Sequence, residues 1–504
     1  MESLDSNSKR TEGGIESNDT YVLNTSDGNT IAIETDRVPV KQRLGLVDGI
    51  AFVVGAIIGS GIFISPKGAL QNSGSVGMCL LIWVISGFMS FCMAMVYADF
   101  GTMMPRSGGD YTYIRVLIGS LPAFLITWVS TTLSTPGGMA LQSLVFADYL
   151  CAPLFDSCGP PDSIRKTIAA LTMITLALTN TISVRLVASV QGIFTVLKTM
   201  ILIIISVGGF VYLFQGKTEN FENSFEGTTT ELASITLAIY KCMFAYSGYN
   251  NLNEIAEELI SPRKNIPKAI TISLTIVTVI YMATNVSYFT VLSKSEFLSV
   301  SAVAYAWGDK VLGAASIIIP IGVMCSVYGT CNSGVFTNVR VRFAAARAGH
   351  LPEVLSFLHH KTRIPVVALW LNTLWALVLL IPGDIDQLMN LTMFIGLASN
   401  LLTMAAYFRL RYLRRNKPRG EDEFRLPIAV PILATLITIF LTVTPFTRNP
   451  KIEFLYGVAF VAAGLIVYVP FVHFQVKLPG LDHVTTILQL LFDICPTVQE
   501  KDEL

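Results

Sequence analysis

Charged side chains are scarce in this sequence. Asp, Glu, Lys and Arg make up 14% of the 504 residues, whereas a soluble domain usually carries about 25%. The 35 basic and 35 acidic residues give a formal net charge of +0, so the composition gives no reason to expect a nucleic-acid partner. Histidine is also rare, and the eight cysteines show no spacing typical of a metal site. We therefore expect no metal, no cofactor and no nucleic-acid binding.

Hydrophobic residues, by contrast, make up 52% of the chain and gather in long runs. Each run is near or above the ~20 residues that span a bilayer. In hydrocarbon only helices or closed barrels satisfy the backbone, and runs of this length indicate helices. We therefore predict an all-α membrane protein embedded in the lipid bilayer, with twelve transmembrane helices. Their approximate limits are 46–70, 76–103, 121–150, 166–184, 190–214, 232–259, 268–292, 312–345, 366–382, 387–409, 427–446 and 454–476.

The two ends of the chain are polar. Residues 1–40 hold no apolar stretch and predict a disordered cytoplasmic tail without a cleavable signal peptide. The twelve-helix membrane domain would cover 41–476, followed by a cytoplasmic tail at 477–504. The chain ends in KDEL, an ER-retrieval signal by its letters. Because that signal is received in the lumen, we interpret the match as coincidence.

Basic residues favour one orientation of the helices. With the N-terminus in the cytoplasm, the loops after helices 6, 8 and 10 are the richest in Lys and Arg, while the outer loops hold at most two each. This asymmetry follows the positive-inside rule, and an even helix count places both termini in the cytoplasm. The basic residues concerned are Arg263, Lys264, Lys268, Arg340, Arg342, Arg347, Lys361, Arg363, Arg409, Arg411, Arg414, Arg415, Lys417, Arg419 and Arg425.

Two apolar runs are interrupted near their middles. The first helix contains Gly59, Ser60 and Gly61, which weaken a helix and let the backbone unwind. Close packing of helices through small residues is the alternative interpretation. The sixth run has a similar interruption at 244–251 (FAYSGYNN). Broken helices at corresponding positions of two halves are typical of transporters with inverted repeats. We therefore predict a five-plus-five inverted repeat at about 46–214 and 232–409, with extra helices at 427–476.

Two broken helices suit an α-amino acid. A half-helix N-terminus exposes N–H groups and a partial positive charge that attract a carboxylate, and unwound carbonyls attract an ammonium. Because an amino acid carries both groups on one carbon, the two breaks together could bind its backbone. Gly61→Ala should then abolish uptake while sparing surface expression.

Few charges lie within the apolar runs. Lys198 in the fifth helix is the clearest buried cation. Because a lysine within the membrane is costly to bury, we expect it to have a function. It could take the place of a sodium ion beside the break in helix 1, or it could extend to the cytoplasmic face. Glu254, Glu257 and Glu258 follow the second break, where they could gate the site or be solvated.

Several motifs in order resemble the L-type amino acid transporter family, the light chains of heteromeric amino acid transporters within the amino acid–polyamine–organocation superfamily. The resemblance runs from about residue 40 to 476. It is carried by 55–66 (GAIIGSGIFISP), 105–111 (PRSGGDY), 252–258 with 265–268 (NIPK), 329–332 (GTCN) and 347–352 (RAGHLP).

The resemblance implies sodium-independent obligatory exchange of amino acids by alternating access, with site roles for individual residues. Ser60 and Gly61 would hold the substrate carboxylate. The carbonyls of Ile57, Phe244 and Ser247 would take its ammonium. Phe244 would also be an aromatic lid, Asn250 would line the side-chain pocket, and Lys198 would stand in for sodium.

The resemblance also implies a partner and a location. Light chains of this family bond to a single-pass glycoprotein heavy chain through a cysteine in the outer 3–4 loop, at the plasma membrane. Cys158 stands at that position in this sequence, and Cys151 is the rival in the same loop. A Cys151–Cys158 bridge is a second possibility, and an outer loop is oxidising enough for either bond.

The sequence departs from the family pattern around the side-chain pocket. Tyr249 and Leu397 stand where relatives carry Trp, and Ser247 is neither the Gly nor the Asp of other members. With no acid in the second break, we expect neutral, mainly large, L-amino acids, and cationic ones if another group supplies charge. The alternatives are a transporter without a heavy chain, a channel, which needs a continuous polar path, and a membrane enzyme, which needs clustered acids or histidines.

Overall fold

The computed structural model describes most of the chain, in two units. The described residues are 20–24, 30–34, 44–104, 109–155, 160–182, 184–360, 362, 364–382, 384–416, 424–447, 452–476 and 481–496. The first unit covers Met1–Arg43 and the second Leu44–Leu504. In the first unit, β1 (Thr20–Asn24) and β2 (Thr30–Glu34) pair in antiparallel fashion. The disordered tail at 1–40 stays a prediction.

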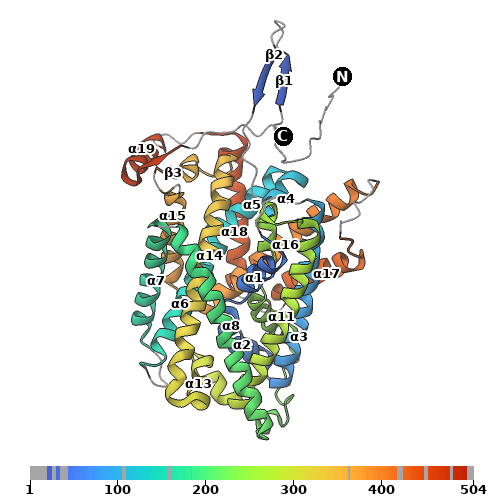
Figure 1. The fold of residues 1–504 in the computed structure, drawn as a ribbon, viewed down its shortest axis with the longest axis vertical. Helices are drawn as coiled ribbons and strands as arrows, with labels where there is room; N and C mark the ends of the chain where they lie inside the picture. Colours follow the sequence, from blue (N-terminus) through green and yellow to red (C-terminus); the bar gives the residue numbers. More distant parts are fainter. Residues whose placement is uncertain are drawn as a thin grey trace. The chain divides into compact units, whose positions relative to one another are not determined.

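The second unit is a bundle of helices (Figure 1). The helices of its first half are α1 (Leu46–Ile57), α2 (Gly61–Ser73), α3 (Val76–Met103), α4 (Gly109–Leu117), α5 (Ser120–Val129), the π-helical η1 (Ser130–Ser134), α6 (Thr135–Cys151), α7 (Asp162–Ile182), α8 (Val184–Phe214) and η2 (Glu219–Phe221). The next helices, which cover the sixth to eighth predicted runs, are α9 (Leu232–Ala245), α10 (Asn251–Glu254), η3 (Ala256–Glu258), α11 (Pro262–Val291), α12 (Lys294–Ser299), α13 (Val303–Leu312), η4 (Gly313–Ile317) and α14 (Ile318–Arg347).

The C-terminal part of the bundle adds further helices and one small strand pair. Its helices are η5 (Glu353–Ser356), α15 (Val366–Leu380), α16 (Ile385–Leu413), α17 (Ala429–Val443), η6 (Thr444–Phe446), α18 (Ile452–Tyr468), η7 (Val469–His473) and α19 (Leu481–Phe492). The strands β3 (Leu358–His359) and β4 (Ile494–Cys495) pair in antiparallel fashion and bring the C-terminal region beside the segment after α14.

Each predicted apolar run overlaps a helix of the structure, and local signals explain several ends. α3 has the limits that the sequence predicted; Ser75 caps it by accepting a hydrogen bond from the amide of Met78 at 3.4 Å. At the start of α16, Asp384 accepts from the amide of Asp386 at 2.8 Å. The sequence therefore predicted helix positions well wherever apolar residues run without interruption.

Length and apolarity qualify seven helical stretches of the described chain as membrane spans, and the bent pair α1–α2 would make eight. These stretches are Val76–Met103, Phe194–Phe214, Pro262–Val291, Val303–Arg347, Ile385–Leu413, Ala429–Phe446 and Phe454–His473. The chain is thus a multi-pass, nearly all-helical membrane protein. The count of twelve and the inverted repeat stay predictions.

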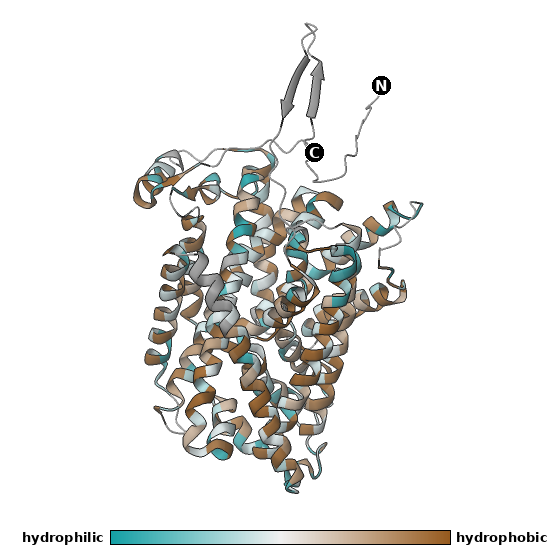
Figure 2. Ribbon diagram, in the orientation of Figure 1, coloured by the Kyte–Doolittle hydropathy of each residue, from teal (hydrophilic) through white to brown (hydrophobic). Residues whose placement is uncertain are grey.

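Large apolar side chains face outward from the bundle. Phe88 of α3 is 58% exposed and Ile466 of α18 is 75% exposed, and hydrophobic residues are frequent along the long helices (Figure 2). A soluble monomer rarely exposes such extensive apolar surface. The exposed faces therefore require lipid as their solvent.

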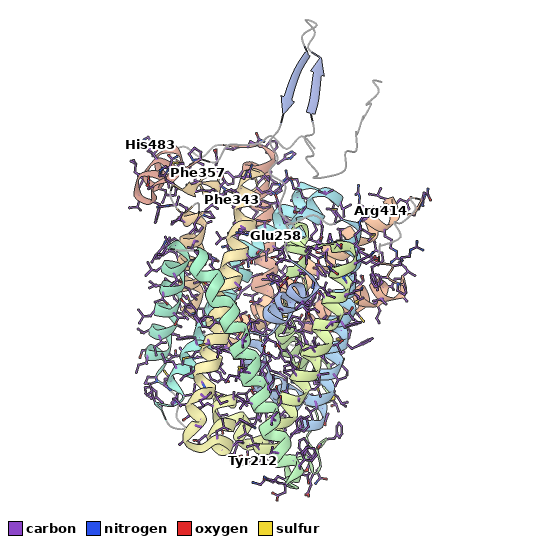
Figure 3. The ribbon with its side chains drawn as sticks, in the orientation of Figure 1. Tyr212, Glu258, Phe343, Phe357, Arg414 and His483 are labelled. Atoms are coloured by element: carbon purple, nitrogen blue, oxygen red, sulfur yellow. The ribbon has the colours of Figure 1, made fainter. Side chains whose placement is uncertain are left out.

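The basic ends of two helices correct a detail of the sequence interpretation. Arg340, Arg342 and Arg347 were expected in a loop, but α14 continues to Arg347. Likewise α16 continues to Leu413 and includes Arg409 and Arg411. Arg is a good helix former, so these helices continue beyond their apolar runs. The basic segments still gather at one end: Glu258, Phe343 and Arg414 lie towards the end of the bundle opposite Tyr212 (Figure 3).

Candidate functional site at the two helix breaks

The first helix is broken where its glycines predicted. α1 ends at Ile57 and α2 begins at Gly61, and the two axes meet at 47°. Ile58 leaves the helical conformation, with φ −70° and ψ 100°. Beyond it, α2 starts a new set of hydrogen bonds, in which the amide of Phe63 donates to the carbonyl of Ser60 at 3.0 Å. The break is therefore an unwound segment at 58–60.

The second break lies between α9 and α10. The hydrogen bonds of α9 end around Ala245, and residues 246–250 form turns before the short α10. Gly248 has φ +106°, a backbone conformation that residues with a Cβ atom rarely adopt. This break lies within the interruption at 244–251 that the sequence predicted. Glycine is favoured at position 248 because the backbone there has a positive φ.

The two breaks contact each other. A Cβ atom added to Gly61 would lie 2.4 Å from the Cα of Ala245, and one added to Gly248 would lie 2.9 Å from the carbonyl oxygen of Ala56. Both distances are too short for real side chains. Glycine at these positions lets the start of α2 approach the end of α9, and the end of α1 approach the turn after α9.

Tyr281 of α11 ties both breaks to the surrounding helices. Its hydroxyl lies 3.1 Å from the carbonyl oxygen of Ile57 and 3.0 Å from that of Ala245, as their hydrogen-bond donor. The ring is fully buried and makes an edge contact with Trp83 of α3. The last carbonyl of each half-helix is thus held by one side chain. The sequence offered no signal for this role, since Tyr281 lies in an ordinary apolar run.

A cavity of about 430 Å³ opens beside the second break. Among the residues with predicted roles, Phe244, Ser247 and Asn250 line it. So do Tyr249 and Leu397, two of the departures from the family pattern. Its volume falls in the range of small-molecule sites, about 300–1,000 Å³. The structure thus brings the predicted side-chain pocket together.

Three residues of the first break have predicted roles: Ser60 and Gly61 for the substrate carboxylate, and Ile57 for its ammonium. Ile57 is 3% exposed and Ser60 is 2% exposed, and Gly61 is buried. None of the three belongs to the described lining of the cavity. The close contact between Gly61 and Ala245 accounts for this burial. The first break and the cavity are therefore neighbours that are joined through α9.

Two carboxyl groups line the cavity where the chain leaves the second break. Glu254 is the last residue of α10, and Asp110 lies in the first turn of α4. The hydroxyl of Thr403 donates to the Asp110 carboxyl at 3.2 Å. Burial raises the pKa of Asp110 above its ordinary value, and hydrogen bonds from Tyr97 and Thr403 oppose the shift. Within the described lining of the cavity there is no Lys or Arg. Sequence reasoning missed Asp110, because its motif falls between two apolar runs.

Lys198 of α8 is buried beside the first break. Its ammonium donates to the carbonyl oxygen of Gly55 at 2.5 Å, and the residue is 1% exposed. A lysine that extended to the membrane surface would be more exposed. Gly55 of α1 also packs against Thr195, which lies in α8 like Lys198: a Cβ added to Gly55 would lie 3.2 Å from the Thr195 methyl group. Lys198 thus links α8 to the last turn of α1 before the break.

Of the three acids after the second break, Glu254 faces the cavity, while the Glu258 carbonyl accepts a hydrogen bond from the amide of Leu44 at 3.1 Å. The side chain of Glu257 lies outside the described residues. Cys158 also lies outside them. Cys151, the rival for the bond to the heavy chain, is the last residue of α6 and is 1% exposed.

His350, after α14, joins two loop regions near the basic end. Its Nδ1 lies 3.1 Å from the hydroxyl of Tyr111, and its Nε2 lies 2.7 Å from that of Ser120. Burial, helped by the positive charge of Arg115, lowers the pKa of His350 to about 4. The ring is therefore neutral near pH 7 and couples the segment after α14 to α4 and α5.

Comparison with known proteins finds relatives whose sequences match nearly the whole chain. The model of a family described as amino acid permease matches residues 44–471. The human b(0,+)-type amino acid transporter 1 is 39% identical over 475 residues, which cover 93% of this chain and 96% of that protein. The human cystine/glutamate transporter is 36% identical over 483 residues, 95% of each chain. The human large neutral amino acids transporter small subunit 2 is 38% identical over 443 residues, 87% of this chain and 82% of its own.

Proposed function

The chain belongs to the amino acid permease family, and from this premise we propose that it is a sodium-independent exchanger of L-amino acids that works by alternating access. The family and the relatives above are transporters, and this protein is a transporter rather than an enzyme. The observation that carries the finer proposal is the contact between two broken helices beside a cavity of small-molecule size.

The two breaks supply complementary chemistry for an amino acid backbone. The first turn of α2, at Ser60 and Gly61, presents the positive end of a helix to a carboxylate. The carbonyls of Ile57, Phe244 and Ser247, at the ends of α1 and α9, suit an ammonium. Phe244, which is half-buried between these groups and the cavity, is the proposed lid, and Asn250 lines the side-chain pocket. In this conformation the carboxylate half is closed, so binding requires α2 and α9 to part slightly.

Sodium independence rests on Lys198. Its ammonium already donates to the Gly55 carbonyl beside the first break, where a bound cation would otherwise neutralise the unwound backbone. A fixed positive charge there makes a sodium ion unfavourable by repulsion. The proposed consequence is exchange that runs at the same rate with and without sodium.

Substrate charge is proposed from the cavity lining. Large neutral amino acids fit the volume of the cavity, whose lining contains both apolar and polar side chains. Asp110 and Glu254 add two carboxyl groups with no basic residue in the described lining, which supports cationic substrates as well. These two residues are the additional charged groups that the second break itself lacks.

The remaining proposals concern topology and assembly. We take the twelve runs as membrane helices, with repeats at about 46–214 and 232–409 and both termini in the cytoplasm. The gathering of basic residues at one end of the bundle supports this orientation. As a light chain in the plasma membrane, the protein would bond through Cys158 to a single-pass glycoprotein heavy chain.

Exchange in liposomes tests the function. Purified protein is reconstituted, and uptake of radiolabelled leucine, arginine and glutamate is followed with and without internal amino acid and with and without sodium. We expect saturable leucine and arginine uptake only when internal substrate is present, and no effect of sodium. Uptake that does not saturate, or that needs no internal substrate, would instead support a channel or a uniporter. A requirement for sodium would contradict the role of Lys198.

Non-reducing electrophoresis tests the heavy chain. In cells that express a heavy chain, the wild-type chain should run as a larger complex that reducing agent dissolves. Cys158→Ser should abolish the complex, and the matched control Cys151→Ser should retain it. A complex that depends on Cys151 instead would assign the bond to that residue. No complex at all would leave a transporter that acts without a covalent partner.

A further inference from the structure

Lys241 is a second buried lysine in the membrane region, which the proposed mechanism does not use. It lies in α9, one turn before Phe244, and is 2% exposed. Burying a charged side chain in a membrane helix costs free energy, so such a residue usually has a function and a partner of opposite charge. Its position on the broken helix, next to the proposed lid, makes that partner important.

The partner lies on α16. The ammonium of Lys241 contacts the carboxylate of Asp386 at 2.6 Å and the carbonyl oxygen of the same residue at 3.3 Å. Asp386 lies in the first turn of α16 and is 58% exposed, whereas the lysine is buried. The stem of Lys241 also packs against α2, since a Cβ added to Gly68 would lie 3.2 Å from its Cγ and Cδ. Three helices therefore meet at one ion pair.

The same two helices both contribute residues to the cavity lining. In α9, Lys241 comes one turn before the lining residue Phe244, and the acidic Glu254 follows the break. In α16, Asp386 comes about two turns before Met393, and Asn400 lies further along. Both helices thus run from the ion pair, past the cavity wall, towards its acidic end. The pair therefore lies on the side of the cavity away from Asp110 and Glu254.

We propose that the Lys241–Asp386 pair is a latch that closes this side of the cavity by holding α9 against α16, and that it must break before substrate can enter from there. The proposal rests on the proposed function, because a latch has this meaning only in a transporter that opens to alternate sides. Under the proposed topology, the latched side is the extracellular one.

The unequal burial of the two partners predicts how variants differ. Removing Asp386 breaks the latch and also takes away the carboxylate that the buried Lys241 ammonium contacts, which disfavours the closed side strongly. Removing the charge of Lys241 breaks the latch and leaves only the largely exposed Asp386, a smaller effect. Neutralising both partners breaks the latch without a buried charge, so it should resemble loss of Lys241 alone.

The experiment measures the apparent KM from each membrane face in liposomes of known orientation. Occupancy of the outward-open state changes apparent affinity in opposite directions on the two faces. For Lys241→Met and for Lys241→Met/Asp386→Asn, we expect the outer KM to fall and the inner KM to rise, each by about three- to tenfold. Asp386→Asn should shift both further, and the swap Lys241→Asp/Asp386→Lys should move the ratio back towards wild type.

The pair of Glu296 and Lys310 provides the matched control. Its atoms are 2.8 Å apart, but both side chains are nearly half exposed, so Glu296→Gln should leave both KM values unchanged. If KM moves in the same direction on both faces, or if the double neutral variant behaves as wild type, the pair is no latch. If Asp386→Asn fails to fold, the double variant Lys241→Met/Asp386→Asn still tests whether the pair is a latch. Wild-type exchange in the same vesicles tests the proposed function separately.

Discussion

The side-chain hydroxyl of Tyr281 donates to the carbonyl oxygen of Ile57, across 3.1 Å, at the residue where α1 ends. The same hydroxyl lies 3.0 Å from the last carbonyl of α9, at Ala245. One buried phenol on an unbroken helix therefore spans both broken ones. We infer that it holds the two half-helices in register and passes the Ile57 carbonyl to the substrate ammonium when substrate binds.

Replacing Tyr281 with Phe should slow exchange. The loss leaves two carbonyls at the breaks without their donor, and one unsatisfied buried group costs about 1–3 kcal/mol, so we expect roughly a tenfold lower maximal rate. Tyr288→Phe on the same helix is the control, because its buried hydroxyl has no hydrogen-bond partner in the described structure. Initial rates of leucine exchange in liposomes measure the effect. Equal rates for both variants would remove Tyr281 from the mechanism.

Gly61→Ala should prevent correct folding rather than impair transport alone. The added methyl group would lie 2.4 Å from the backbone of Ala245, and no side-chain movement relieves that overlap. The sequence alone suggested normal surface expression, and the structure revises that expectation. Gly138→Ala is the control, since its Cβ would meet no atom within 4 Å. Surface biotinylation should detect Gly138→Ala at wild-type amounts and little Gly61→Ala; abundant Gly61→Ala protein would contradict the packing argument.

Lys198→Met should abolish most exchange while leaving the protein folded. The thioether keeps much of the volume but loses the charge beside Gly55, so the unwound backbone loses its fixed cation. The control is Lys268→Met, because Lys268 is exposed at the start of α11. Radiolabelled uptake with and without sodium, corrected for surface amount, measures both variants. Unchanged exchange in Lys198→Met would mean that the lysine has only a packing role.

Glu254→Gln should reduce transport of cationic amino acids more than that of neutral ones. Glu254 lines the cavity together with Asp110, and glutamine keeps the shape of the side chain but cannot carry a negative charge opposite a cationic substrate. We expect the ratio of arginine to leucine uptake to fall by about three- to tenfold, because a charge pair at an effective dielectric near 20 is worth a few kcal/mol before solvation. Glu258→Gln, outside the described cavity lining, should leave the ratio unchanged. A constant ratio in Glu254→Gln would exclude this carboxyl from substrate selection.

Acid should destabilise the protein partly through His350. Burial lowers the pKa of this ring to about 4, below its ordinary value of about 6.5. The unfolded chain therefore binds a proton that the folded chain rejects, and stability falls as the pH drops from about 6.5 towards 4. Between pH 7 and 5 the loss should be on the order of 1 kcal/mol. His350→Gln should show a smaller decrease in Tm over this range; an identical decrease would assign the effect to other groups.

The sequence alone determined much of this protein, because hydrocarbon allows few solutions. Apolar runs of bilayer length had to be helices, and the limits of α3 coincide with those predicted. Gly59, Ser60 and Gly61 predicted the first break, since glycine weakens a helix wherever it stands. Phe244, Ser247 and Asn250, which the family resemblance singled out within the second interruption, line the cavity, and their roles in binding stay predictions.

Only the tertiary structure decided which distant residues meet. Tyr281 reaches both breaks, Asp110 shares a cavity with Glu254, and Lys241 pairs with Asp386 across 145 positions of the chain. Ser60 and Gly61 proved to be buried behind the cavity, because α2 packs directly on the end of α9. Composition and periodicity describe one helix at a time. Which helices lie beside one another depends on packing between segments far apart in the chain, and no local pattern records it.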